Sequence, residues 1–191
     1  LLDEMTHDEA RNALVADLAR SCVAEGHPTL VFTHRVEHAR KLADEVFAGE
    51  GCGLLIGGAD NSVRFEEDRA RLLDGRIKLA VGTVQAIGQG LDLPSVARGI
   101  VATPIAGNRQ LFGQVRGRIC RPSNGKRDAA LLYLLDWHVY PKHVRNLITW
   151  NATVRVLDGE EWVELHQAEL DQRERERREW TPPPGSPVFE D

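Results

Sequence analysis

The chain of 191 residues predicts an α/β fold in which helices cover both faces of a mostly parallel β-sheet. Short apolar runs rich in β-branched residues alternate with longer segments of helical periodicity, the pattern of repeated βαβ units. Glycines follow several of the helical segments, as expected where a helix ends. The length suits one domain of ordinary size with appendages.

The elements follow one another in a regular order. Thr6 and Glu9 have the spacing of a capping box and predict the start of a helix that ends at Gly26. A second helix is expected from about 36 to 47, and Asn61 or Ser62 is placed to cap a third. Five buried strands are predicted, at 29–33, 53–57, 77–81, 98–102 and 129–135.

The remainder of the chain differs in character from this alternation. A short helix is expected within 141–150, a hairpin at 153–157 and 161–165, and a charged helix at 171–180. The proline-rich end predicts no regular structure. We therefore divide the chain into an α/β domain at 1–136, a small C-terminal α/β extension at 137–180 and a disordered tail at 181–191.

Composition excludes some classes of protein. Charged residues make up 28% and hydrophobic residues 42%, and the net charge of −5 argues against a uniformly basic nucleic-acid coat, although a local basic groove stays open. No apolar run approaches a membrane span, so no membrane partner is expected. Cys22, Cys52 and Cys120 are widely spaced and odd in number, which favours a reducing, cytoplasmic location without disulfides.

The segment 108–127 carries six basic residues and no acidic one. Within it, Gln114, Arg118 and Arg121 are spaced to share one face of a helix, while Arg116 points elsewhere. Leu111, Val115 and Ile119 form the apolar stripe that would seat this helix on a sheet. Gly117 would let a backbone or ligand approach. Such a face suits phosphate, with a solvated basic helix as the alternative.

A glycine-rich segment, 82–94, follows the third predicted strand. Thr83 offers a hydroxyl and an N–H to a phosphate oxygen, and Gly82 and Gly90 let a backbone come close. Asp92, held before Pro94, is placed to accept a hydrogen bond from a ribose hydroxyl. An ordinary loop, with Asp92 as a cap or turn residue, is the alternative.

His34 and His38 follow the first strand and lie four residues apart on an expected helix. This spacing suits a pair of metal ligands, but no third ligand accompanies them, and two solvent-exposed histidines are the preferred interpretation. No metal site is predicted. The loop 57–62 is a further place where backbone N–H groups could meet a strand of nucleic acid.

Gln-x-x-Gly-Arg-x-x-Arg at 114–121 resembles motif VI of superfamily 2 DEAD/DEAH-like helicases and translocases. Thr83, Gly90 and Asp92 resemble motif V, with one extra residue between Thr83 and Gly90. This longer spacing is similar to that of phage-type and restriction-enzyme-like members. The segment 29–35 resembles motif IV. The three occur in family order, each after a predicted strand. The chain is identified on this resemblance as the C-terminal, second RecA-like domain, a three-layer α/β sandwich.

The resemblance implies roles for individual residues. Arg118 and Arg121 would reach the γ-phosphate of ATP, with Gln114 positioning the phosphate or water, and Gly90 and Asp92 would contact the nucleotide. Gly82, Thr83, His34 and Arg116 would lie on the nucleic-acid side. No Gly-x-x-x-x-Gly-Lys-Ser/Thr loop and no Asp-Glu pair after an apolar strand occur here, so ATP and Mg²⁺ would be held mainly by an N-terminal RecA-like domain of the same parent.

The implied function is the second motor domain of an ATP-dependent helicase, inactive by itself. The resemblance favours DNA over RNA as the partner. A non-catalytic nucleic-acid-binding module, or a subunit that completes a partner's ATPase site in trans, is the alternative. An unrelated α/β enzyme, such as a glycosyl- or methyltransferase, has no supporting motif.

Overall fold

The computed structural model describes residues 2–88, 92–104, 109–123, 126, 128–136, 155–158, 161–164 and 167–179. The chain divides into two compact units, Leu1–Leu134 and Leu135–Asp191, and each is described by itself. The boundaries inferred from sequence, at 136 and 180, stay predictions.

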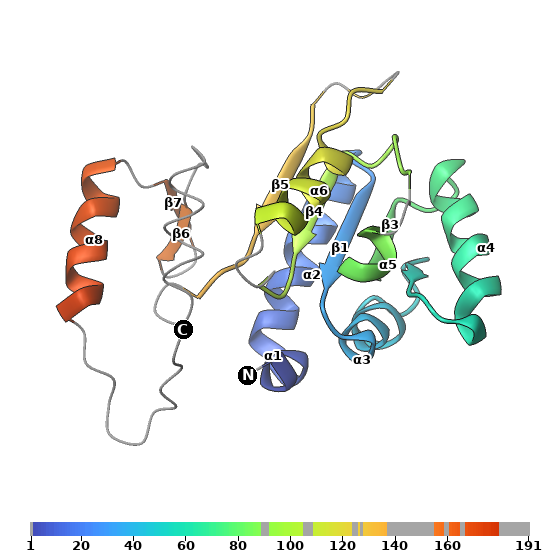
Figure 1. Cartoon of the computed structure of the whole chain (residues 1–191), viewed down its shortest axis with the longest axis horizontal. Helices are drawn as coiled ribbons and strands as arrows, with labels where there is room; N and C mark the ends of the chain where they lie inside the picture. The colour runs from blue at the N-terminus through green and yellow to red at the C-terminus, as the bar shows by residue number, and fades with distance from the viewer. Residues whose placement is uncertain are drawn as a thin grey trace. The chain divides into compact units, whose positions relative to one another are not determined.

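The first unit is built on a five-stranded parallel sheet (Figure 1). The strands lie in the order β2-β3-β1-β4-β5, and every pairing between neighbours is parallel. Their bounds are β1 (Thr29–Thr33), β2 (Gly53–Leu55), β3 (Leu79–Thr83), β4 (Arg98–Val101) and β5 (Ala130–Tyr133). The predicted α/β class with a parallel sheet is confirmed.

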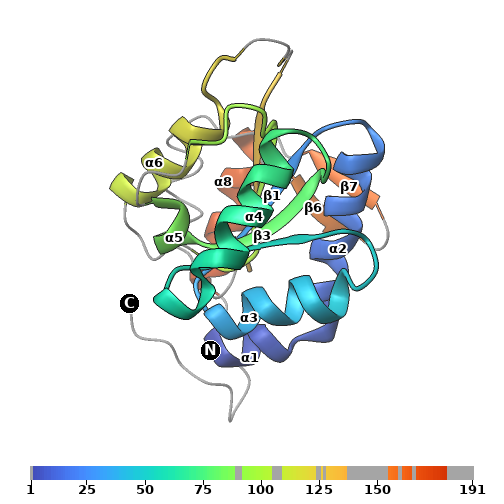
Figure 2. The same cartoon turned by 90° about the vertical axis from the view of Figure 1, so that its right-hand side faces the viewer.

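Helices connect these strands and cover both faces of the sheet. Their bounds are α1 (Leu2–His7), α2 (Glu9–Ala24), α3 (Val36–Arg40), the π-helical continuation η1 (Lys41–Val46), the 3₁₀ turn η2 (Ala59–Asn61), α4 (Ser62–Leu73), α5 (Val84–Gly88) and α6 (Arg109–Ile119). Figure 2 shows α1 beside α3, which follows β1 in the chain and contacts it.

The two faces of the sheet make separate hydrophobic clusters because side chains alternate along each strand. Val31 of β1 packs with α2, α3 and η1 on one face, whereas its neighbours Leu30 and Phe32 pack with α4 and α6 on the other. All three side chains are at most 1% exposed. The sheet is therefore the middle of three layers.

Two local predictions are corrected by the structure. The helix expected to start from a capping box at Thr6 instead starts after Asp8, whose carboxylate accepts a hydrogen bond from the Arg11 N–H at 3.0 Å. Thr6 is buried in the preceding helix α1. β3 runs two residues further than predicted, so Gly82 and Thr83 end the strand rather than follow it. Asp8 is the cap because it directly precedes α2 and its carboxylate accepts from an N–H of the first turn, whereas Thr6 lies within α1.

The second unit contains the predicted hairpin and charged helix. β6 (Arg155–Asp158) pairs with β7 (Glu161–Glu164) in antiparallel register, and α8 (Gln167–Glu179) carries alternating charges. The helix predicted within 141–150 and the tail 181–191 lie outside the described residues. Among the described helices, none combines the length and apolar character that crossing a bilayer requires.

Candidate functional site

The carboxyl ends of the central strands bring polar residues together, as parallel sheets generally do. Thr33, the last residue of β1, is the Cα partner of Thr83, the last residue of β3. The Thr83 side chain is 4% exposed, and its hydroxyl oxygen accepts a hydrogen bond from the Ala86 N–H at 3.3 Å. Thr83 therefore stabilises the first turn of α5 and keeps its hydroxyl hydrogen available for donation.

His34 ties the end of β1 to the end of β4. Its backbone N–H donates to the hydroxyl of Thr103 at 2.9 Å, and Thr103 itself is fully buried. Partial burial, followed by the nearby Arg35 guanidinium, lowers the pKa of the His34 imidazole. The ring is thus a neutral polar group at pH 7 at the edge where β1, β3 and β4 end.

His38 corrects the expectation of two solvent-exposed histidines. Its side chain is fully buried, with Nδ1 3.0 Å from the Thr33 hydroxyl and Nε2 2.8 Å from Oδ1 of Asn12. Burial, followed by the charges of Arg11 and Lys41, lowers its pKa to about 4. The i, i+4 spacing with His34 does not produce a metal pair, because both ring nitrogens of His38 are engaged with Thr33 and Asn12.

A buried arginine fixes the adjacent strand ends. Arg11 of α2 is 9% exposed, and its guanidinium donates to the carbonyls of Ala102 at 2.9 Å and Leu134 at 3.0 Å. These carbonyls follow β4 and β5, where the ladder no longer supplies N–H donors. A charged donor from α2 replaces them, which rigidifies this edge of the sheet.

The helix α6 is seated on the opposite face by its predicted apolar stripe. Val115 and Ile119 are at most 2% exposed, and Leu111 packs against the same cluster. Gly99 of β4 lies beneath the helix: a Cβ there would approach Cδ1 of Leu131 to 2.7 Å and Cγ1 of Ile119 to 3.0 Å. The missing side chain is what lets the last turn of α6 lie so close to the sheet.

Arg121 lies just beyond α6, rather than on it as the sequence predicted. The helix ends at Ile119, and Pro122 disfavours a helical conformation at the residue before it. The Lys126 ammonium donates to the carbonyls of Ile119 and Arg121, the latter at 3.2 Å, and so caps the helix end. Partial burial lowers the pKa of Lys126.

The side chain of Arg121 meets Asp92. Its Nη1 is 2.9 Å from Oδ1 of Asp92, and both side chains are 60% exposed. A second tie holds the same two segments, because the Ser123 hydroxyl donates to the carbonyl of Pro94 at 2.7 Å. The two residues singled out from separate motifs are therefore neighbours on one accessible surface.

The other predicted residues of α6 distribute over its outer side. Gln114 and Arg116 are exposed, and Arg118 is half-buried and engaged in interactions. In the part of the chain that the structure describes, a Cβ at Gly117 would meet nothing within 4 Å, so the helix surface is open there. Gly90 lies outside the described residues.

The predicted site residues thus form two groups at opposite edges of the sheet. β4 and β5 are parallel, and β5 begins where Ala130 pairs with Arg98, the first residue of β4. The connection containing α6 must therefore return from the carboxyl edge to the amino edge (Figure 1). Gly82, Thr83 and His34 lie at the carboxyl edge, whereas Asp92 and Arg121 lie beyond the far end of α6.

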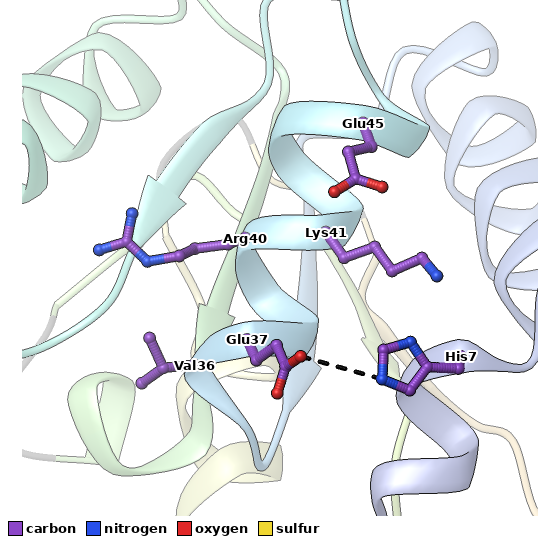
Figure 3. A pocket seen from close by; sticks show the side chains of 6 residues that line it. All are labelled: His7, Val36, Glu37, Arg40, Lys41 and Glu45. Atoms are coloured by element: carbon purple, nitrogen blue, oxygen red, sulfur yellow. Dashed lines mark ion pairs between the residues drawn. The ribbon is translucent and has the colours of Figure 1, made fainter.

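A pocket of about 580 Å³ lies between α1, α3 and η1 (Figure 3). His7 and Glu37 face each other across it at 3.8 Å, and the side chains of Arg40 and Lys41 point in opposite directions. Its lining carries both signs of charge. The pocket lies beside the carboxyl edge but includes none of the predicted site residues.

Two kinds of residue were not predicted from the sequence: buried polar residues of α2 and the residue that caps α6. Asn12 and Arg11 occupy buried positions of α2, and Lys126 caps α6. The sequence does place polar residues on the apolar face of α2. Because buried polar groups need hydrogen-bond partners, this pattern could have indicated Arg11 and Asn12. Within the described ranges, no three His, Cys, Asp or Glu side chains are grouped so that they could hold a metal ion.

No protein-family model and no curated protein matches the sequence. Solved structures do match the fold. E. coli DEAD-box protein SrmB, bound to regulator of ribonuclease activity A, is 25% identical over 70% of this chain and 75% of that one, with a TM-score of 0.54.

Two further structures are more distant in sequence. T4 UvsW is 12% identical over 93% of this chain, with a TM-score of 0.57, and the chain spans only 33% of UvsW. The C-terminal domain of the DEAD-box protein Dbp5 is 15% identical over 89% of this chain and 91% of that one, with a TM-score of 0.56. At such identities the likeness is one of fold. The parallel five-stranded sheet between two helical layers is that of a RecA-like domain, and the chain has the fold of a superfamily 2 helicase C-terminal domain.

Proposed function

We propose that the chain is the second motor domain of an ATP-dependent nucleic-acid helicase or translocase. The observation that carries the proposal is the meeting of Asp92 and Arg121, which lie 2.9 Å apart and exposed although they are 29 residues apart in sequence. They belong to the two segments that the motifs single out. The fold likeness to SrmB, UvsW and Dbp5 supports a motor-domain role.

The surface around Asp92 and Arg121 has the chemistry that a nucleoside triphosphate requires. Asp92 accepts hydrogen bonds and suits a ribose hydroxyl, while Arg121 and Arg118 suit the γ-phosphate, where a guanidinium stabilises charge that develops during phosphoryl transfer. Gln114 is exposed on the preceding turns and suits the positioning of phosphate or water. Gly90 completes the proposed contacts.

Binding would replace the ion pair between Asp92 and Arg121. An exposed pair contributes about 0–1 kcal/mol, so its loss costs little compared with a guanidinium–phosphate contact. Arg121 would leave Asp92 for the phosphate, and the freed carboxylate would accept from the sugar. ATP supplies the phosphoryl group and Mg²⁺ its charge neutralisation, and both would be held chiefly by an N-terminal RecA-like domain of the parent.

The carboxyl edge is proposed to follow the nucleic-acid backbone. Thr83 retains a hydroxyl hydrogen for a phosphate oxygen, Gly82 admits close approach, and neutral His34 can donate a hydrogen bond. Arg116 is exposed and adds a positive charge. We propose DNA rather than RNA as the partner, on the spacing between Thr83 and Gly90.

The test uses the protein that joins this chain to its first RecA-like domain, with Arg121→Ala as the variant. We expect the ATPase rate stimulated by single-stranded nucleic acid to fall by ~10³-fold or more, as loss of an arginine finger does. Parallel assays with DNA and RNA of one sequence decide the polymer. An unchanged stimulated rate would remove Arg121 from the proposed site.

Arg76→Ala is the matched control, because Arg76 forms a comparably exposed ion pair, with Asp74 at 2.7 Å, on another part of the surface. Its stimulated rate should stay within about twofold of the original, a change too small for an arginine finger. The 191-residue chain alone should hydrolyse no ATP. Activity above background in that sample would contradict the assignment of the P-loop and magnesium site to another domain.

A further inference from the structure

A continuous buried hydrogen-bond chain lies behind the carboxyl edge of the sheet. It joins Thr33 of β1 to His38 of α3 at 3.0 Å, His38 to Asn12 of α2 at 2.8 Å, and Asn12 to the carbonyl of Thr6 in α1 at 3.1 Å. All four residues are at most 3% exposed. Four separate elements are thus connected by three buried side chains and one backbone carbonyl.

The carbonyl of Thr6, at the end of this series of hydrogen bonds, determines the direction of every bond in the series. A carbonyl can only accept, so the Asn12 amide turns its Nδ2 towards Thr6 and its Oδ1 towards His38. His38 must then carry its hydrogen on Nε2, which leaves Nδ1 as an acceptor. The Thr33 hydroxyl therefore donates to Nδ1, and its rotation is fixed.

The surroundings keep His38 neutral. The charged or titratable groups that act on it are Arg11 from α2, Lys41 from η1 and His7 from α1, and each opposes a positive charge on the ring. β1 presents only the Thr33 hydroxyl. A protonated ring would have a second N–H pointing at Thr33 and would reverse the last hydrogen bond of the chain.

Thr33 connects this buried chain to the proposed nucleic-acid contacts. It is the Cα partner of Thr83 and directly precedes His34, whose N–H donates to Thr103 at 2.9 Å. α1 is held to the same turn from outside, because Arg35 pairs with Asp3 at 3.0 Å. The position of the β1 end therefore depends on His38 although His38 faces no ligand.

We propose that His38 is a positioning residue for the nucleic-acid edge: through Thr33 it fixes the end of β1 and thereby the positions of His34 and Thr83 at the carboxyl ends of β1 and β3. Neutral His38 with its hydrogen on Nε2 is the competent form. The inference rests on the proposed function, since it assumes that the carboxyl edge binds nucleic acid.

The chain offers a matched pair of substitutions within one strand. Thr33 and Thr29 are both fully buried in β1, and each makes one side-chain hydrogen bond, Thr29 to the carbonyl of His27 at 2.9 Å. Thr33→Val and Thr29→Val each remove one hydroxyl while keeping the shape of the side chain. Their effects on stability should be similar, so their effects on binding can be compared directly.

Binding is measured with a fluorescein-labelled single-stranded oligodeoxythymidine and the whole chain, together with the melting temperature. Thr33→Val should raise the Kd about tenfold, the effect of losing one well-placed phosphate contact, whereas Thr29→Val should stay within about twofold. Thr33→Ser, which keeps the hydroxyl, should restore the original Kd. Equal Kd values for the two valine variants would overturn the proposal.

A second measurement does not depend on nucleic acid. Amide hydrogen exchange of His34 should accelerate in Thr33→Val and in His38→Gln, and stay unchanged in Thr29→Val. Nitrogen-15 spectra of the imidazole should show the hydrogen on Nε2. If the chain binds no oligonucleotide, the proposed function fails, yet these two readouts still decide the positioning role: unchanged exchange or the other tautomer would refute it.

Discussion

The two edges of the sheet hold their polar residues under opposite physical conditions. At the carboxyl edge, Thr33, Thr103 and His38 are fully buried and partnered. Beyond the far end of α6, Asp92 and Arg121 are paired but 60% exposed. One edge is held in place before any ligand arrives, and the other is accessible and weakly held.

This difference suits two kinds of ligand contact. A polymer backbone that must be followed step by step needs donors in fixed register, and buried hydrogen bonds provide that rigidity. A phosphate that enters from another domain needs an arginine free to move, and a solvated ion pair releases it at small cost. The helix α6 itself is held on the sheet by Val115 and Ile119, and the last turn lies close above Gly99.

Acidification should cause the largest loss of stability, and this loss should originate at the carboxyl edge. The pKa of His38 falls from 6.5 to about 4 in the fold, so the unfolded chain takes up the proton at a higher pH than the native chain does. The stability that His38 contributes is complete above pH 6.5 and is lost as the pH falls towards 4, by about 3 kcal/mol in all.

Urea unfolding at several pH values measures this loss, with His38→Gln as the reference. The difference in free energy of unfolding between the two proteins should shrink as the pH falls through that window. His34, whose pKa is also lowered, is present in both and does not affect the difference. A difference that stays constant from pH 7 to pH 4 would show that His38 titrates normally in the fold.

Gly99→Ala should act on the far edge by lifting the last turn of α6 from the sheet. The added methyl would approach Leu131 to 2.7 Å and Ile119 to 3.0 Å, so side chains or backbone must shift. We expect a loss of about 2 kcal/mol in stability, typical of overpacking. Gly113→Ala on the same helix, where nothing lies within 4 Å, is the control in thermal unfolding and should not destabilise.

Gly117→Ala should separate stability from function on α6. The position is open, and alanine favours a helix over glycine by about 1 kcal/mol, so the melting temperature should rise. In the protein with both RecA-like domains, the new methyl would face the incoming phosphate, and the stimulated ATPase rate should fall. A rise in both quantities would argue that this surface of α6 meets no ligand.

Asp92→Asn should have the smallest effect on the folded chain. The ion pair with Arg121 is exposed, so its loss should change the free energy of unfolding by less than about 1 kcal/mol. Binding of a fluorescent ATP analogue to the two-domain protein should nevertheless weaken, because the amide is a poorer acceptor for a ribose hydroxyl than the carboxylate. A large stability loss would mean that the pair supports the fold.

Much of the architecture could be predicted because hydrophobic periodicity is a local property. The runs around Val31, Val81 and Ile100 became the centre of the sheet, and the stripe of Val115 and Ile119 seats α6. Arg121 was predicted on α6 because it continues the helical spacing of Gln114 and Arg118. The helix ends earlier because Pro122 disfavours a helical conformation at residue 121. His38 was misjudged because its burial depends on α2, which lies far away in sequence.

The sequence by itself determined the order of elements, the parallel class of the sheet and the segments that carry Thr83, Asp92 and the arginines. These follow from local propensity, periodicity and motif spacing. Only the tertiary structure decided that Asp92 lies against Arg121, that Thr33 aligns with Thr83, and that His38 is a buried neutral link. Such facts depend on crossover geometry and long-range packing, which no local pattern of residues encodes.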